Sequence, residues 1–109
     1  MNFSLMFSQN SDSARIQCNG ELDIFSKIEF ENKAFSAIDK CNTLEIDLSD
    51  VEYMDSSGLA GIIGVAKKYA QNNKSIIISG ARDSIKSQFR LIDMKTALQK
   101  INADNIIKE

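Results

Sequence analysis

The chain has 109 residues, with 15 acidic and 13 basic side chains that give a net charge of −2, and 43% of its residues are hydrophobic. This length and composition predict one globular domain over residues 1–109. The largest basic cluster is Lys67-Lys68, which argues against a nucleic-acid partner. No apolar run approaches the roughly 18 residues of a membrane span, and the N-terminus does not resemble a secretory signal, so a cytoplasmic location is expected.

Several kinds of catalytic and cofactor chemistry are disfavoured by the residues that the sequence lacks. The chain contains no histidine, which removes Ser-His-Asp triads, Cys-His pairs and imidazole metal ligands. It also lacks a P-loop and a strand-associated G-x-G-x-x-G motif. Cys18 and Cys41 do not form a C-x-x-C pair and are predicted to be buried free thiols. We therefore expect a binding module without cofactor or metal, not an enzyme.

The first part of the chain has the pattern of two strands followed by a helix. Alternating apolar residues predict strands at 2–9 and 14–18, joined by a tight turn. Ser26 and Glu29 have the spacing of a capping box, which predicts a helix from Ser26 to about Lys40. The buried stripe of this helix is expected to comprise Ala34, Phe35, Ile38 and Cys41.

The second part continues the alternation of strands and helices. The predicted elements are a strand at 43–48, a loop at 49–57, a helix from near Ser57, a strand at 74–79, a helix at 84–92 and a weaker strand at 97–101. The tail, 102–109, is interpreted as a last helical turn or a frayed end. This order predicts an α/β fold, in which strands joined by a crossover helix lie parallel with right-handed connections.

The parallel arrangement has a consequence for polar residues that are distant in the chain. The segment after the second strand and the segment after the third strand leave from carboxyl ends at the same edge of the sheet, where open α/β sheets place their sites. Asp23 lies in the first segment, and Asp55, Ser56 and Ser57 lie in the second. We expect these four side chains to form one surface cluster.

The stretch MDSSGLAGIIG, residues 54–64, has two interpretations. Asp and Ser are preferred helix N-caps, so DSSG could do no more than begin a helix. Three successive capping side chains exceed that need, and Gly58 would leave the hydroxyls open to a large partner. Gly61 and Gly64 follow Ser57 along one helical stripe, although glycine within a helix costs about 1 kcal/mol relative to alanine. The stripe indicates either close packing within the fold or a smooth surface for another protein.

The stretch LEIDLSDVEYMDSSGLAGIIG resembles the signature of the STAS domain, in particular that of stand-alone bacterial anti-sigma factor antagonists. The segments NGELDI and SIKSQFRLIDM are also similar to family segments. The resemblance implies a four- to five-stranded mixed β-sheet flanked by three to four α-helices. It implies that Ser57 is phosphorylated by a kinase that is itself the anti-sigma factor. Ser56, Asp23 and Asp55 would then neighbour the phosphosite.

The partners that the resemblance implies are an anti-sigma factor of the histidine-kinase-like ATPase type and a phosphoserine phosphatase. We expect the chain to be a monomer, because the glycine-bearing surface suits a different protein. A STAS scaffold or regulatory subunit of another pathway is the alternative. A hydrolase with Ser56 or Ser57 as nucleophile is disfavoured because no activating base is adjacent. A purely structural cap predicts that Ser57→Asp leaves binding unchanged.

Overall fold

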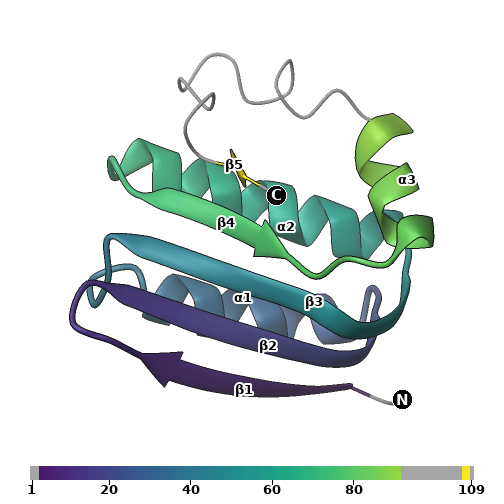
Figure 1. Cartoon of the computed structure of the whole chain (residues 1–109), viewed down its shortest axis with the longest axis horizontal. Coiled ribbons are helices and arrows are strands. Elements are labelled where there is room, and N and C mark those ends of the chain that lie inside the picture. The colour runs from purple at the N-terminus through teal and green to yellow at the C-terminus, as the bar shows by residue number, and fades with distance from the viewer. Residues whose placement is uncertain (1–2, 92–106, 109) are drawn as a thin grey trace.

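The computed structural model describes residues 3–91 and 107–108 of the chain. The elements in order are β1 (Phe3–Gln9), β2 (Ser13–Leu22), α1 (Ser26–Ser36), β3 (Thr43–Met54), α2 (Ser56–Gln71), β4 (Ser75–Ser79), α3 (Asp83–Leu91) and β5 (Ile107–Lys108) (Figure 1). The strands form a five-stranded sheet in the order β1-β2-β3-β4-β5. The mixed α/β fold predicted from the sequence is therefore confirmed.

The sheet combines one antiparallel pair with parallel pairs. β1 pairs antiparallel with β2 through a tight turn, in which the Asn10 N–H donates to the Ser13 carbonyl at 2.8 Å. The pairs β2-β3, β3-β4 and β4-β5 are parallel. The pair β4-β5 shows that the predicted helical or frayed tail is wrong at 107–108, which extend the sheet beside β4; the rest of the tail lies outside the described residues. The predicted strand at 97–101 lies outside the described residues.

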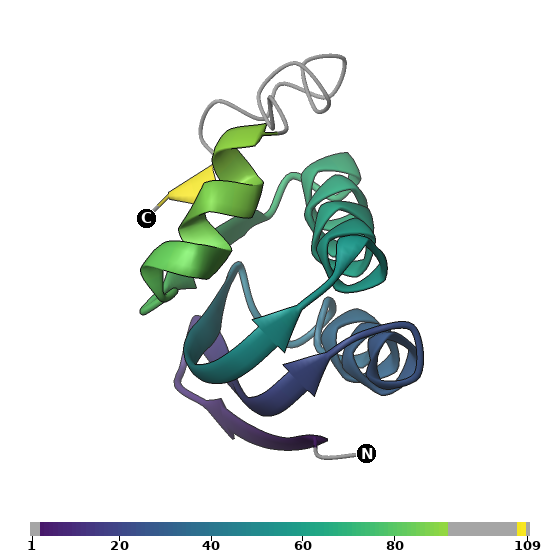
Figure 2. The same cartoon turned by 90° about the vertical axis from the view of Figure 1, so that its right-hand side faces the viewer.

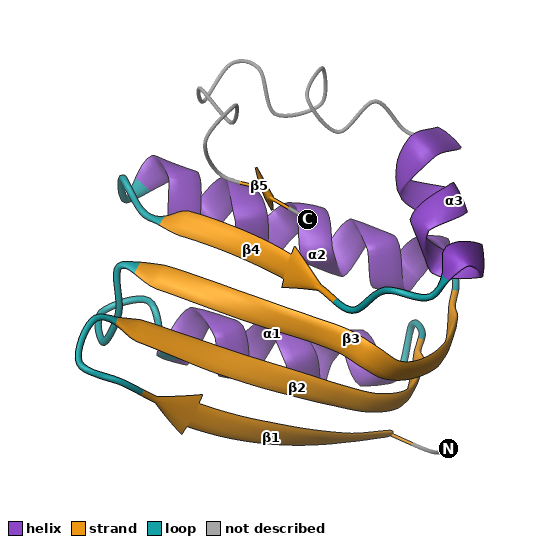
Figure 3. Ribbon diagram, in the orientation of Figure 1, coloured by secondary structure: helices purple, strands orange, loops and turns teal. Residues whose placement is uncertain are grey.

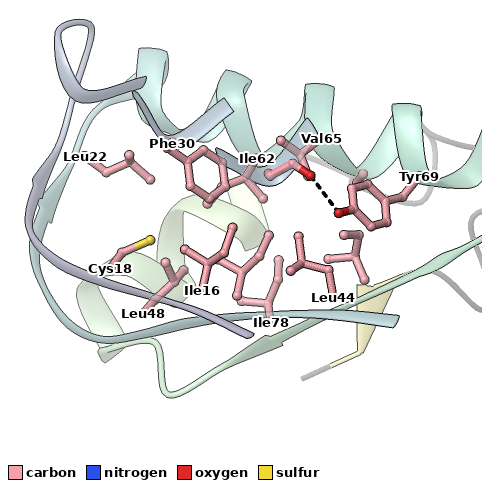
Figure 4. Packing of buried hydrophobic residues seen from close by; sticks show 14 of the residues in the cluster. Ile16, Cys18, Leu22, Phe30, Leu44, Leu48, Ile62, Val65, Tyr69 and Ile78 are labelled. Carbon is pink, nitrogen blue, oxygen red and sulfur yellow. Dashed lines mark hydrogen bonds between the residues drawn. The ribbon is translucent and has the colours of Figure 1, made fainter. Parts of the chain in front are cut away.

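Helices α1 and α2 lie side by side on one face of the sheet, as the view along the strands shows (Figure 2). In Figure 3 both helices, in purple, lie behind the orange strands. Apolar side chains on the inner face of β2, β3 and β4 meet apolar side chains of both helices. The residues labelled in Figure 4 are Ile16, Cys18, Leu22, Phe30, Leu44, Leu48, Ile62, Val65, Tyr69 and Ile78, all buried. Removing this apolar surface from water is the main force holding the two layers together.

The two cysteines contribute to this core as predicted. Cys18 and Cys41 are both buried free thiols. Burial raises the pKa of the Cys18 thiol to about 12, with a further contribution from the Asp47 carboxylate. Cys18 is therefore protonated at neutral pH and inert as a nucleophile.

Tyr69 joins the two helices through a buried hydrogen bond. Its hydroxyl donates to the Ala34 carbonyl at 2.7 Å (dashed line in Figure 4). We expect Tyr69→Phe to lower the free energy of unfolding by about 1–2 kcal/mol, because the Ala34 carbonyl loses its side-chain donor inside the core. Urea denaturation measures this loss. Tyr53→Phe, at a tyrosine that is half exposed, should change the stability by less than about 0.5 kcal/mol.

Helix α1 ends earlier than predicted. It stops at Ser36 instead of Lys40, and the chain continues in turns with i→i−3 bonds, such as the Lys40 N–H to the Ala37 carbonyl at 2.9 Å. Tightened turns of this kind are common at helix ends. The expected stripe nevertheless faces the core, because Ala34, Ile38 and Cys41 are buried and the partly buried Phe35 packs against the core cluster.

The third strand is longer than predicted, and the predicted loop over 49–57 is wrong. β3 continues to Met54, which leaves only Asp55 before α2. The pairing of β2 with β3 shifts register after Gln17 and again after Gly20. Gly20 has a φ of 103°, a conformation that glycine adopts without strain. After the shifts Val51 and Met54 are buried, so the strand keeps a core face although its alternation changes phase.

Candidate functional site

The first turn of α2 is built around Asp55. Asp55 has an extended backbone with φ −103° and ψ −174°, and its carboxylate accepts the Gly58 N–H at 3.0 Å. This is the N-cap predicted from DSSG, and a carboxylate there also interacts favourably with the helix dipole. One of the three capping side chains therefore begins the helix. Of the two serines that follow, Ser56 is exposed and Ser57 is partly exposed.

The turn before α1 lies at the same edge of the sheet and is built around Asp23. The Asp23 carboxylate accepts the N–H groups of Phe25 and Ser26, both at 3.0 Å. The Ser26 hydroxyl in turn accepts the Asp23 N–H at 2.9 Å. These reciprocal bonds are those of a capping box. The predicted box of Ser26 with Glu29 is wrong, because Ser26 is the second member of a box that begins three residues earlier.

The hydrogen bonds around Asp23 determine its titration. The Ser26 backbone N–H contributes most, and with the Phe25 N–H and the Ser26 hydroxyl it lowers the pKa of the Asp23 carboxyl below its ordinary 3.8, against the opposing effect of desolvation. Because the folded pKa is the lower one, the ionised form stabilises the fold above pH 3.8, and this stabilisation is lost as the pH falls through the folded pKa.

We therefore expect Asp23→Asn to lose less stability than wild type when the pH falls below 3.8. Urea unfolding at several pH values measures this dependence, and carbon NMR of the Asp23 carboxyl gives its pKa directly. Asp50→Asn is the matched control, because Asp50 is exposed and its carboxylate accepts from the Gln17 side chain. An equal effect of both substitutions would contradict the assignment to Asp23.

Leu22 joins the two turns. Its carbonyl accepts the Asp55 N–H at 3.3 Å and also lies against Gly58 in α2. The last residue of β2 is therefore in contact with the residues on either side of the two serines. The structure brings Asp23, Asp55 and the two serines to one edge of the sheet, as the parallel arrangement predicted. The predicted surface cluster is wrong for Asp23, which is buried because its carboxylate is used within its own turn.

The three glycines of α2 face other parts of the same chain. Gly58 is buried, and a Cβ there would lie 2.9 Å from the Met54 Cγ and still closer to the Leu22 carbonyl. A Cβ at Gly61 would lie 3.1 Å from the Cγ of Lys27 in α1. One at Gly64 would lie 3.6 Å from a Glu31 carboxylate oxygen. This is the close packing that one interpretation of the stripe predicted. A role in partner binding stays a prediction.

Other residues of this edge were not singled out from the sequence. Gln88 in α3 donates to the Met54 carbonyl at 2.7 Å, next to Asp55. Apolar side chains in the turn before α1 and near the end of β3 are also exposed: Phe25 is 70% exposed, Ile24 53% and Tyr53 51%. For Ile24 and Phe25 the sequence offered one signal, their position directly after Asp23. Two successive apolar residues are unusual in a solvated turn.

Comparison with known proteins identifies the family. The STAS domain model matches residues 6–105, so the chain belongs to the STAS domain family. The anti-sigma-B factor antagonist of Staphylococcus aureus is 29% identical over 96 residues, which cover 87% of this chain and 89% of that protein. The anti-sigma-B factor antagonist of Staphylococcus epidermidis is 28% identical over 96 residues, with the same coverage.

Solved structures show the same fold. The anti-sigma factor antagonist SpoIIAA in its unphosphorylated form has a TM-score of 0.72 and 16% identity, covering 97% of this chain and 88% of that one. A putative anti-sigma factor antagonist from Thermotoga maritima has a TM-score of 0.75 and 22% identity, covering 96% and 86%. The phosphorylated form of the Bacillus cell fate determinant SpoIIAA has a TM-score of 0.71 and 18% identity, covering 89% and 86%.

Proposed function

We propose that the chain is an anti-sigma factor antagonist, a protein-binding module that is switched by phosphorylation of Ser57. Unmodified, it binds an anti-sigma factor that is also a serine kinase of the histidine-kinase-like ATPase type, and the sigma factor is released. Phosphorylated, it dissociates until a phosphoserine phosphatase resets it. The module acts as a cytoplasmic monomer and binds neither cofactor nor nucleic acid.

The observation that supports this proposal most directly is the position of Ser57 in the STAS signature. It lies in the first turn of α2, where Asp55 already supplies the cap and leaves the serine hydroxyl free of that role. The relatives that cover most of the chain are named anti-sigma-B factor antagonists, and SpoIIAA occurs in a phosphorylated form. These names support the same role for this chain.

The surface around Ser57 also suits a protein partner. Ile24 and Phe25 in the turn before α1 and Tyr53 near the end of β3 expose apolar area, and Asp55 in the following residues is partly exposed. Exposed apolar side chains that gather in one region are typical of protein-binding surfaces. None of the helices in residues 3–91 has the length and apolarity needed to cross a bilayer.

Phosphosite mapping tests the proposal. The protein is incubated with ATP and lysate of its own cells, and wild type is compared with Ser57→Ala and Ser56→Ala by intact mass and peptide mapping. We expect a gain of about 80 Da, the mass of one phosphoryl group, that only Ser57→Ala abolishes. Modification that persists in Ser57→Ala would contradict the assignment. Without any phosphorylation, the alternative of a STAS scaffold in another pathway gains support.

A further inference from the structure

Lys27 lies in the first turn of α1, and its side chain packs against α2 at Gly61, one helical turn after the proposed phosphosite. Its N–H donates to the Asp23 carbonyl at 2.9 Å, which places it one helical turn after Asp23. Its side chain crosses α2 at Gly61, where a Cβ would lie 3.1 Å from the Lys27 Cγ and 3.8 Å from its Cδ. The glycine therefore makes room for the lysine stem between the two helices.

The two helices run in the same direction, so the Lys27 side chain starts one helical turn from the level of Ser57. Lys27 lies opposite Gly61 and Ala34 lies opposite Tyr69, so α1 and α2 run parallel (Figure 1). Side chains of a helix lean toward its N-terminus. The Cα–Cβ bond of Lys27 thus points toward the start of both helices. Ser57 precedes Gly61 by four residues, about 6 Å along the axis, which is within the reach of a lysine side chain whose Cγ and Cδ lie at Gly61.

The charges around Ser57 are mainly negative. Asp23 and Asp55 stand on the N-terminal side, and Glu31 faces Gly64 on the other side. Within the part of the chain that the structure describes, the ion pairs are those of Arg15 with Glu45 and Asp47, so the Lys27 ammonium has no carboxylate within ion-pair distance. A phosphoryl group on Ser57 would add a charge of about −1.5 to −2 to this region.

We propose that Lys27 is the cation that binds the phosphate of phosphorylated Ser57. The inference rests on the proposed function, since it takes Ser57 as the phosphoacceptor. The ammonium group offsets repulsion between the phosphate and the carboxylates of Asp23 and Asp55, so that the modified chain stays folded. Phosphorylation then changes what the surface binds and leaves the two turns in place.

The test uses phosphoserine incorporated during translation at position 57, or at position 56 for comparison. Phosphorus NMR follows the second pKa of the phosphate, about 6 in a free phosphoserine. We expect this pKa to be about 0.5 lower in wild type than in Lys27→Met, because a nearby cation favours the dianion. Methionine retains an unbranched apolar stem over Gly61, and Lys27→Arg should restore the lower pKa.

Two controls make the expected difference specific. Lys68→Met removes a lysine about 16 Å further along α2 and should leave the pKa of the phosphate at position 57 unchanged. The effect of Lys27→Met should also be larger for phosphoserine at 57 than at 56. Equal pKa values in wild type and Lys27→Met, or equal effects at both positions, would overturn the inference. Because translation installs the phosphate, a lack of phosphorylation in cells would contradict only the proposed function.

Discussion

Gly58→Ala is expected to lower the free energy of unfolding by about 2 kcal/mol. The new Cβ would lie 2.9 Å from the Met54 Cγ and closer still to the Leu22 carbonyl oxygen. The oxygen belongs to the end of β2 and also accepts the Asp55 N–H, so it cannot move without disturbing the start of α2. Overpacking of this kind typically costs 1–3 kcal/mol. Urea denaturation of wild type and variant measures the difference.

Gly64→Ala is the matched control in the same helix. Its Cβ would meet a Glu31 carboxylate oxygen at 3.6 Å, an ordinary contact. Alanine is a better helix former than glycine by up to about 1 kcal/mol, so this variant should be as stable as wild type or more stable. A destabilisation as large as that of Gly58→Ala would show that the contact with Leu22 does not explain why residue 58 is glycine.

The parts of the site predicted correctly depend on local chemistry and on one general rule of topology. The capping side chain in DSSG predicted the start of α2, and Asp55 is indeed the cap. The rule that a crossover helix joins parallel strands predicted that Asp23 would lie beside the serines, and β2 and β3 are parallel. Neither inference required knowledge of how side chains pack.

The parts that could not be predicted depend on contacts between distant residues. β3 was expected to end at Leu48, followed by a loop over 49–57. Pairing with β2 carries the strand to Met54 with two register shifts, which no pattern within one strand reveals. The capping box was assigned to the wrong pair for a similar reason, since Ser26 and Asp23 satisfy each other.

The sequence alone could not decide whether the glycine stripe of α2 serves packing within the fold or binding of another protein. Spacing places Gly61 and Gly64 on one face of α2 but does not say what lies opposite. The structure places Lys27 and Glu31 of α1 there, so the glycines allow the two helices to approach closely. Near the helix starts, by contrast, Phe25 and Ser56 are exposed, and the proposed function places the partner there.

Phosphoserine at position 57 is expected to weaken binding to the anti-sigma factor kinase by about 1,000-fold. Within the chain an anion in the first turn of α2 is tolerated, because it gains about 0.3–1 kcal/mol from the helix dipole and free amides. Against a docked partner that presents a carboxylate, two like charges about 4 Å apart repel by roughly 4 kcal/mol at an effective dielectric of 20. Calorimetric titration with the kinase found by phosphosite mapping measures the affinity.

Two variants separate the charge from other consequences of modification. Ser57→Ala, which removes the hydroxyl and adds no charge, should bind the kinase within a few-fold of the unmodified protein. Ser57→Asp should bind more weakly, because it places one negative charge in the first turn of α2. Melting temperatures of the unmodified and phosphorylated proteins should be similar, since the proposed switch acts on docking and not on folding. If phosphorylated protein binds as tightly as unmodified protein, then DSSG serves only to cap α2, and the partner must be regulated at another surface.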